Sequence, residues 1–252
     1  TPQSGRDVMS DTDDWDFYPL RVEGAQASIF LNMSIAARAP VRGHDHSAHL
    51  RVVMLRPRDD GLSSQEEYDD LVELEDAVTA AIAKHSPTTY VGRNTSHGNR
   101  DLYFYTNDPQ RFEWAARAAM TGFSAYRFEA GTRRDAEWST YFDFLYPSSW
   151  DRQLMGNRRV VSMLEEQGDD VNAPREIDHL VVFADASSSQ AFCTIVESLG
   201  YEVISATPDD QDHRVNFKRV DRPAAIDDVV HELYTVALEH GGDYDGWGCE
   251  AV

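Results

Sequence analysis

Residues 188–206 read SSQAFCTIVESLGYEVISA, and this stretch decides the fold expected for the second half of the chain. Apolar residues fall at helical spacing through Ser188–Leu199, whereas Tyr201–Ala206 is rich in residues that favour strands. Gly200 separates the two patterns, and glycine readily takes the left-handed conformation in which many helices end. The stretch therefore predicts a helix, a sharp stop and a strand.

The segments on either side complete one β-α-β-β-α-β unit. The sequence predicts further strands at Ile177–Ala184, Arg214–Val220 and Asp243–Cys249, and further helices at Asp151–Gln167 and Pro223–His240. The first of these helices precedes the unit. The order of the remaining elements is that of a ferredoxin-like α/β sandwich, in which both helices cover one face of an antiparallel four-stranded sheet.

The first half of the chain repeats this order after a β-hairpin. The hairpin is predicted from strands at Phe17–Val22 and Ser28–Ile35 around the turn pair Glu23-Gly24. The unit that follows has strands at Leu50–Leu55, Thr88–Gly92, Asp101–Thr106 and Phe123–Glu129, and helices at Ser64–Lys84 and Pro109–Met120. Ser64 and Glu67 have the spacing of a capping box at the start of the first helix. We therefore predict the α+β class, with two ferredoxin-like domains.

Composition along the chain divides it into a flexible leader at residues 1–14, a first domain at 15–150 and a second at 151–252. The leader is polar and rich in aspartate, with no apolar period to hold it in place. The joint at residues 131–150 is different, because Trp138–Trp150 is dense in aromatic side chains. Such a segment is too apolar for a free linker. We expect it to pack the two domains together or to close the first.

The charge of the chain indicates what kind of partner it can have. Among 252 residues, 23 Lys and Arg stand against 44 Asp and Glu, a net charge of -21. Residues 147–252 hold 8 basic and 21 acidic residues, and residues 1–146 hold 15 and 23. Such a surface repels the phosphate backbone, so we expect no direct nucleic-acid binding. The acidity either serves solubility alone or fits the second domain to a protein partner with a basic segment.

Other classes of protein are disfavoured by composition. No stretch approaches the roughly 20 apolar residues of a membrane-spanning helix, and the polar start lacks the order of a signal peptide. We therefore expect a cytoplasmic protein with no membrane contact. Cys193 and Cys249 are too few for a disulfide framework, and we expect both to be reduced. The sequence indicates no cofactor and leaves the oligomeric state open.

Four short motifs carry a resemblance to a known family. They are Leu164-Glu165-Glu166, Asp178-His179-Leu180, Leu199-Gly200-Tyr201-Glu202-Val203 and Asp243-Tyr244-Asp245-Gly246-Trp247-Gly248. In this order, over roughly residues 152–250, they resemble the family called regulator of ribonuclease activity B. Residues 15–150 resemble a bacterial domain of unknown function that often precedes such a module.

The resemblance implies a fold and a function. Members of that regulator family are small acidic proteins with a ferredoxin-like fold that bind ribonuclease E and lower its activity, with no chemistry of their own. The chain is therefore expected to be a non-catalytic, protein-binding regulator, with ribonuclease E or a related RNA-processing enzyme as its partner. The extra N-terminal domain departs from the pattern of that family, and kinship by itself does not identify the target.

The candidate binding residues lie on the last helix and the last strand. Glu232 and Glu239 are seven residues apart, on nearly one face of a helix, and could pair with a basic segment. Tyr244 and Trp247 are the residue types enriched at interface hot spots, and Asp245 lies between them. The alternative is structural, because the glycines of this segment suit a β-bulge or a close backbone approach.

A second candidate site is the cluster of His44, His46 and His49. Two histidines on one face of a strand and a third beyond them are a conceivable zinc or nickel set, which would support a metal-assisted hydrolase. The alternative is a polar loop before a strand, which we favour because no second group of ligands stands nearby. Nucleophile and phosphate-loop motifs are absent from the sequence, which favours the non-catalytic interpretation.

Overall fold

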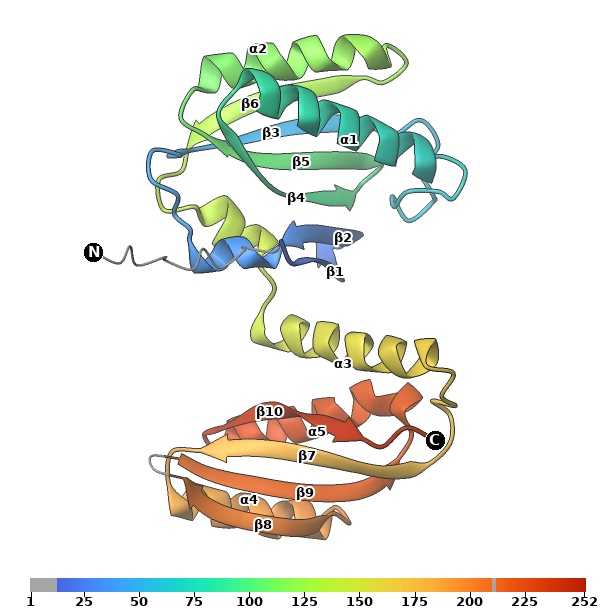
Figure 1. Ribbon diagram of the computed structural model, residues 1–252, viewed down its shortest axis with the longest axis vertical. Coiled ribbons are helices and arrows are strands. Elements are labelled where there is room, and N and C mark those ends of the chain that lie inside the picture. The colour runs from blue at the N-terminus through green and yellow to red at the C-terminus, as the bar shows by residue number, and fades with distance from the viewer. Residues whose placement is uncertain (1–12, 210–211) are drawn as a thin grey trace, which may run out of the picture. The chain divides into compact units, whose positions relative to one another are not determined.

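The computed structural model describes residues 13–209 and 212–252, so nearly all of the predicted leader lies outside the described residues. The contacts divide the chain into two units, with the boundary between Ser148 and Ser149. Each unit is an antiparallel sheet with α-helices against it (Figure 1). The predicted α+β class, with two sandwich domains, is confirmed. No helix in the described ranges is both long and apolar enough to cross a membrane.

The first unit contains a six-stranded sheet in the order β1-β2-β4-β5-β3-β6. Its elements are β1 (Trp15–Val22), β2 (Ala25–Asn32), β3 (His46–Val53), α1 (Tyr68–His85), β4 (Thr88–Ser96), β5 (Asn99–Thr106), α2 (Pro109–Met120) and β6 (Phe128–Arg134). From β3 onward this is the ferredoxin-like arrangement, and the hairpin of β1 and β2 extends the sheet beyond β4. Glu23 and Gly24 form the hairpin turn with φ of 49° and 82°, as a two-residue turn between twisted strands requires.

Two predicted elements of the first unit are displaced. The loop expected at Asn94–Arg100 is mostly strand, because His97 and Gly98, both at positive φ, close a tight turn between β4 and β5. The closing strand lies at Phe128–Arg134 rather than Phe123–Glu129. A short 3-10 turn at Thr121–Phe123 extends α2, and β6 then pairs with β3 from His46 to Val52.

The predicted capping box is wrong. The helix α1 begins at Tyr68, and Glu67 precedes it without a side-chain cap. The Glu67 carboxylate instead accepts hydrogen bonds from the backbone amides of Leu55 and Arg56, at 2.7 and 2.6 Å. It is fully buried, so it fixes the loop that follows β3 rather than the helix end.

The aromatic segment at residues 131–150 packs against the sheet face opposite α1 and α2. It thereby closes the first domain, which is one of the two roles that the sequence predicts for it. Trp138 stacks on Tyr105 of β5 with ring centroids 3.8 Å apart, and both side chains are buried. A π-helical turn at Thr140–Leu145 follows. Its Tyr141 hydroxyl donates to the Asn32 carbonyl at 2.8 Å. The segment therefore belongs to the core of the first unit.

The Asp135 carboxylate is the common hydrogen-bond acceptor that holds the aromatic segment in place. Its carboxylate accepts hydrogen bonds from the Tyr105 hydroxyl at 2.7 Å, the Ser139 amide at 2.8 Å and the Thr140 amide at 2.9 Å. Burial acts to raise the pKa of Asp135, but these hydrogen bonds outweigh it and lower the pKa. The residue is therefore ionised at neutral pH and serves as a common acceptor for the segment.

We expect Asp135→Ala to lower the free energy of unfolding of the first domain by about 2–4 kcal/mol, because several buried donors lose their acceptor. Chemical denaturation followed by tryptophan fluorescence measures the change. Asp143→Ala, which removes an exposed carboxylate from the same segment, is the matched control. Equal losses in the two variants would contradict the role given to Asp135.

The second unit is a four-stranded sheet in the order β10-β7-β9-β8. Its elements are α3 (Ser149–Glu166), β7 (Arg175–Phe183), α4 (Ala186–Ser198), β8 (Glu202–Asp209), β9 (Asp212–Asp221), α5 (Ile226–Glu239) and β10 (Gly242–Cys249). Gly200, at a φ of 86°, follows the end of α4 as predicted. The strand order is that of a ferredoxin-like sheet, preceded by the predicted helix.

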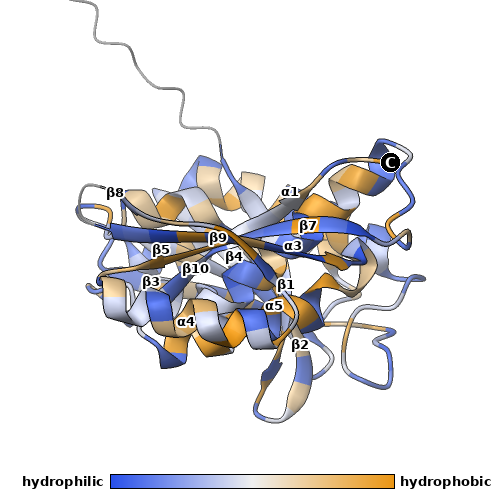
Figure 2. Ribbon diagram, turned by 90° about the horizontal axis from the view of Figure 1, so that it is seen from below, coloured by the Kyte–Doolittle hydropathy of each residue, from blue (hydrophilic) through white to orange (hydrophobic). Residues whose placement is uncertain are grey.

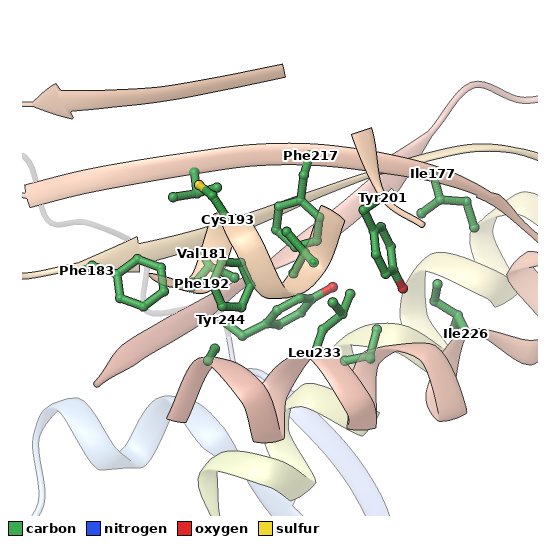
Figure 3. Packing of buried hydrophobic residues seen from close by; sticks show 14 residues of the cluster. Ile177, Val181, Phe183, Phe192, Cys193, Tyr201, Phe217, Ile226, Leu233 and Tyr244 are labelled. Carbon is green, nitrogen blue, oxygen red and sulfur yellow. The ribbon is translucent and has the colours of Figure 1, made fainter. Parts of the chain in front are cut away.

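The core of the second unit lies between one sheet face and the helices α4 and α5. The sheet contributes Ile177, Val181, Phe183, Val215 and Phe217, and the helices contribute Phe192, Val196, Val230, Leu233 and Ala237 (Figure 3). Hydrophobic and hydrophilic residues are mixed along the helices and strands, as amphipathic elements with one buried side require (Figure 2). The opposite sheet face is the one that positions the candidate site.

Candidate partner-binding site in the second unit

A β-bulge in β10 sets the direction of its two aromatic side chains. Tyr244 lies opposite Val181 and Trp247 opposite His179, although the two aromatic residues are three positions apart. Asp245 is the extra residue at which the register shifts. Side chains alternate along a regular strand, so without the bulge Tyr244 and Trp247 would take opposite faces. With the bulge, both take the face that carries the helices.

The backbone conformation at the bulge requires glycine. Gly246 has a φ of 145°, which side chains of L-residues rarely adopt. At the start of the same strand, the Phe183 ring lies where a Cβ of Gly242 would be, with the nearest contact below 2.5 Å. The segment therefore contains the predicted β-bulge, with a glycine at the position whose backbone conformation favours one.

Tyr244 is part of the core and does not face solvent. It is 5% exposed, and its hydroxyl lies 2.8 Å from Nδ1 of His179. Figure 3 shows its ring among the buried side chains next to Leu233 of α5. The imidazole of His179 stacks on Phe217, with centroids 5.4 Å apart. The prediction of a partly exposed anchor at Tyr244 is therefore wrong.

Trp247 ties the edge strand to two helices. It packs against the core, and its indole N–H donates to Oδ1 of Asn157 on α3 at 2.9 Å. Nδ2 of Asn157 donates in turn to Asp227 on α5 at 2.8 Å. Asn157 is 1% exposed. The polar atom of Trp247 is therefore already used inside the domain, which does not favour the predicted anchor role.

Asn157 was not predicted, although the sequence contains a signal for it. Leu154, Asn157, Val161 and Leu164 are spaced as the inward positions of a helix, and Asn157 is the polar member of that series. A buried asparagine at such a position needs partners for its amide group. That requirement points to contacts with other elements before the structure is known.

The opposite face of the sheet has a shallow hollow over the bulge. We call it the glycine hollow. Its volume is about 310 Å³, and its lining includes Asp178, Leu180, Asn216, Asp245, Gly246 and Gly248. A Cβ built at either glycine would meet no atom within 4 Å. The hollow thus exists because the two glycines of β10 carry no side chain.

Carboxylates surround the glycine hollow. Asp178 and Asp245 line it and are exposed, and Asp243 is exposed nearby on β10. Beyond Asp178, Lys218 lies between Glu176 and Glu202, with nitrogen–oxygen distances of 3.0 and 3.9 Å. Arg214 lies with Asp243 and Asp245 around an adjoining depression. The five carboxylates outnumber Lys218 and Arg214, so the area stays negatively charged. The arrangement can hold a cationic side chain whose apolar stem rests on Leu180.

Glu232 and Glu239 lie on a different surface. Both are exposed on α5, which packs against the sheet face that carries the core. The glycine hollow lies on the other side of the same sheet. The five predicted binding residues therefore do not form one site, because among them only Asp245 and Trp247 line the hollow.

The candidate residues His44, His46 and His49 of the first unit do not assemble into a site. Nδ1 of His44 lies 3.1 Å from the Thr89 hydroxyl, and Nδ1 of His46 lies 2.9 Å from Asp45. His49 packs against Gly131 on β6. Within residues 13–209 and 212–252, no three His, Cys, Asp or Glu side chains are grouped to hold a metal ion. The geometry gives the hydrolase alternative no support.

Comparison with known proteins assigns the two halves. Residues 13–146, more than half of the chain, match the Family of unknown function (DUF695). The chain belongs to this family. Residues 155–249 match a second family, described as Regulator of ribonuclease activity B, and this range contains the glycine hollow. The predicted resemblance of both halves is confirmed.

Curated proteins and solved structures give no further assignment of fold or function. No curated protein matches the chain. Among solved structures, an unknown protein from Galdieria sulphuraria is 14% identical, with 82% of this chain and 98% of that one covered and a TM-score of 0.23. A putative glycine cleavage system transcriptional repressor is 10% identical, with coverages of 81% and 98% and a TM-score of 0.22. Superpositions this poor say nothing about a shared fold or function.

The buried His179 predicts a pH dependence of stability. Burial lowers its pKa from 6.5 to about 4. As the pH falls below 6.5, the unfolded chain takes up a proton that the folded chain excludes until about pH 4. The free energy of unfolding is therefore unaffected by this group above pH 6.5 and falls between those values, by about 3 kcal/mol in total.

Urea denaturation of the full chain at several pH values, compared with His179→Phe, tests this dependence. The variant keeps an aromatic ring beside Phe217 but has no group that titrates. As the pH falls, we expect the free energy of unfolding of the unaltered chain to decrease more than that of the variant. A constant difference would show that His179 is not buried in its neutral form.

Proposed function

We propose that this chain is a non-catalytic regulator that binds a basic segment of a ribonuclease through the open sheet face of its C-terminal domain. One observation carries the proposal. The glycine hollow, lined by exposed carboxylates, lies on the domain that matches the regulator family. Ribonuclease E or a related RNA-processing enzyme is the proposed partner.

The shape and chemistry of the hollow fit an arginine or lysine side chain. The aliphatic stem can lie on Leu180 and across the two glycines, where no side chain intervenes. The charged head can then reach the carboxylates of Asp178 and Asp245. Arginine suits this position better than lysine, because its planar guanidinium can bond two oxygens at once and is more weakly hydrated.

Tyr244 and Trp247 hold the strand that carries this site in the proposal. Their contacts with His179 and Asn157 hold β10 and its bulge in place. The bulge places Asp245 and the glycines at the hollow. Both aromatic residues are therefore positioning residues, whose loss would weaken binding through the fold of the strand.

The proposal includes the absence of turnover. Its support is the match to a regulator family, together with the separation of His44, His46 and His49, which leaves the hydrolase alternative without a site. The chain would act on RNA processing only by occupying its partner. Long-range attraction between an acidic domain and a basic segment raises the association rate, and salt screens it.

Binding of the full chain to purified ribonuclease E, measured by surface plasmon resonance, tests the proposal. We expect Asp178→Asn/Asp245→Asn to weaken binding by about tenfold, through the loss of two charge-assisted contacts. Glu232→Gln/Glu239→Gln removes the same charge from the surface of α5 and is the matched control. We expect it to bind as the unaltered chain does.

Three results would contradict the proposal. A loss of affinity confined to the α5 variant would place the interface on that helix. Equal losses in both variants, reversed by low salt, would indicate only a general attraction of net charge. No binding of the unaltered chain at any salt concentration would exclude this partner. Thermal denaturation of each variant confirms that these exposed substitutions leave the fold intact.

A further inference from the structure

The outer face of α2 carries a basic and aromatic strip in an otherwise acidic protein. Arg111, Trp114 and Arg117 recur at every third position and are all exposed, whereas the inward residues of the helix are buried in the core. We call these three residues the α2 strip. Trp114 is 59% exposed, which is unusual for the largest apolar side chain. Surfaces of this composition commonly take part in protein contacts.

The α2 strip is held in position by the end of α1. The side chain of Arg111 donates to the backbone carbonyl of His85. The His85 ring meets Trp114 edge-on, with centroids 5.6 Å apart. The exposed indole of Trp114 is therefore restricted in its motion. A partner that binds it loses less free energy to ordering of this side chain.

The outer face of the neighbouring helix α1 is acidic, whereas the α2 strip is basic. A depression of about 590 Å³, which we call the α1 hollow, is lined by Tyr68, Asp69, Val72, Glu73, Asp76 and Ala77. Tyr68 is 44% exposed. Asp69, Glu73 and Asp76 are all exposed and recur along one side of the helix. The α1 hollow thus has an apolar floor between acidic side chains.

The strip and the hollow lie on the same side of the first domain. Helices α1 and α2 pack in one layer over the sheet, so their outer faces point the same way (Figure 1). The strip offers an indole between two guanidinium groups, and the hollow offers an apolar surface between carboxylates. Because they are complementary and belong to one chain, a second copy of the chain supplies both halves of the contact.

We propose that the helical face of the first domain is a self-association surface, on which the α2 strip of each copy docks in the α1 hollow of the other. A two-fold axis makes the contact twice, which is the usual symmetry of a homodimer. Trp114 would supply the apolar anchor. Arg111 and Arg117 would fix its direction against the carboxylates of Glu73 and Asp76. The proposal is independent of ribonuclease binding, which concerns the other domain.

Analytical ultracentrifugation of the full chain over a wide range of concentrations tests the proposal. We expect a monomer–dimer equilibrium that high salt weakens, and Trp114→Ala should weaken it by about thirtyfold, as the loss of an interface hot spot does. Trp114 is exposed, so its removal should leave the melting temperature unchanged at concentrations where the chain is monomeric. A chain that remains monomeric at every concentration would overturn the proposal.

A charge exchange makes the test specific for these two surfaces. Arg111→Glu/Arg117→Glu and Glu73→Arg/Asp76→Arg should each abolish self-association, because like charges then face each other. An equal mixture of the two variants should form a heterodimer, because both of its contacts pair opposite charges again. Arg42→Glu/Arg134→Glu, which alters two other exposed arginines of the domain, is the matched control and should dimerise normally. A dimer that persists in the first two variants, or a mixture that stays monomeric, would overturn the assignment.

Discussion

Tyr244 and Trp247 take the same side of β10 because Asp245 is an extra residue in that strand. Each aromatic residue then uses its polar atom inside the domain, the hydroxyl with His179 and the indole N–H with Asn157. The edge strand is thereby joined to the adjacent strand and to two helices. The opposite side of the strand keeps two glycines and an exposed carboxylate. One backbone irregularity thus accounts for both the packed face and the acidic hollow.

The two domains differ in how the sheet face opposite the core helices is covered. In the first domain, Trp138 and the π-helical turn after it cover part of that face, with Asp135 as the common acceptor. In the described part of the second domain, exposed carboxylates and half-buried glycines line the corresponding face. A sheet face that its own domain leaves open is available to a partner, whereas one closed by a buried tryptophan is not. This difference directs the proposed ribonuclease contact to the C-terminal domain.

Much of the fold could be predicted, because local patterns and tertiary packing agree. The helix, glycine and strand at residues 188–206 and the Glu23-Gly24 turn follow directly from hydrophobic period and turn chemistry. The failures arise where a long-range contact overrides a local pattern. Glu67 has capping-box spacing, but its carboxylate accepts hydrogen bonds from two backbone amides beyond the end of β3. Buried charge is equally hard to foresee, as with Glu75, which joins Arg93 and Arg100 beneath α1.

The candidate site was predicted less well than the fold, for a related reason. The sequence singled out the segment around Asp245 but not the direction of its side chains, because a single inserted residue reverses the facing of everything after it. Asp178, Leu180 and Asn216 come from other strands and become neighbours of Asp245 only through the register of β7 and β9. Glu232 and Glu239 satisfied the spacing rule for a helix face, but that face lies on the other side of the sheet.

In the proposed complex the open sheet face, and not the surface of α5, receives a basic segment. Amide chemical-shift mapping of the isotope-labelled full chain, titrated with a short arginine-rich peptide, tests it directly. We expect the amide signals of Leu180, Gly246 and Gly248 to shift in a saturable way, while those around Glu232 and Glu239 stay unchanged. Shifts confined to α5, or no shift at the two glycines at saturation, would contradict it.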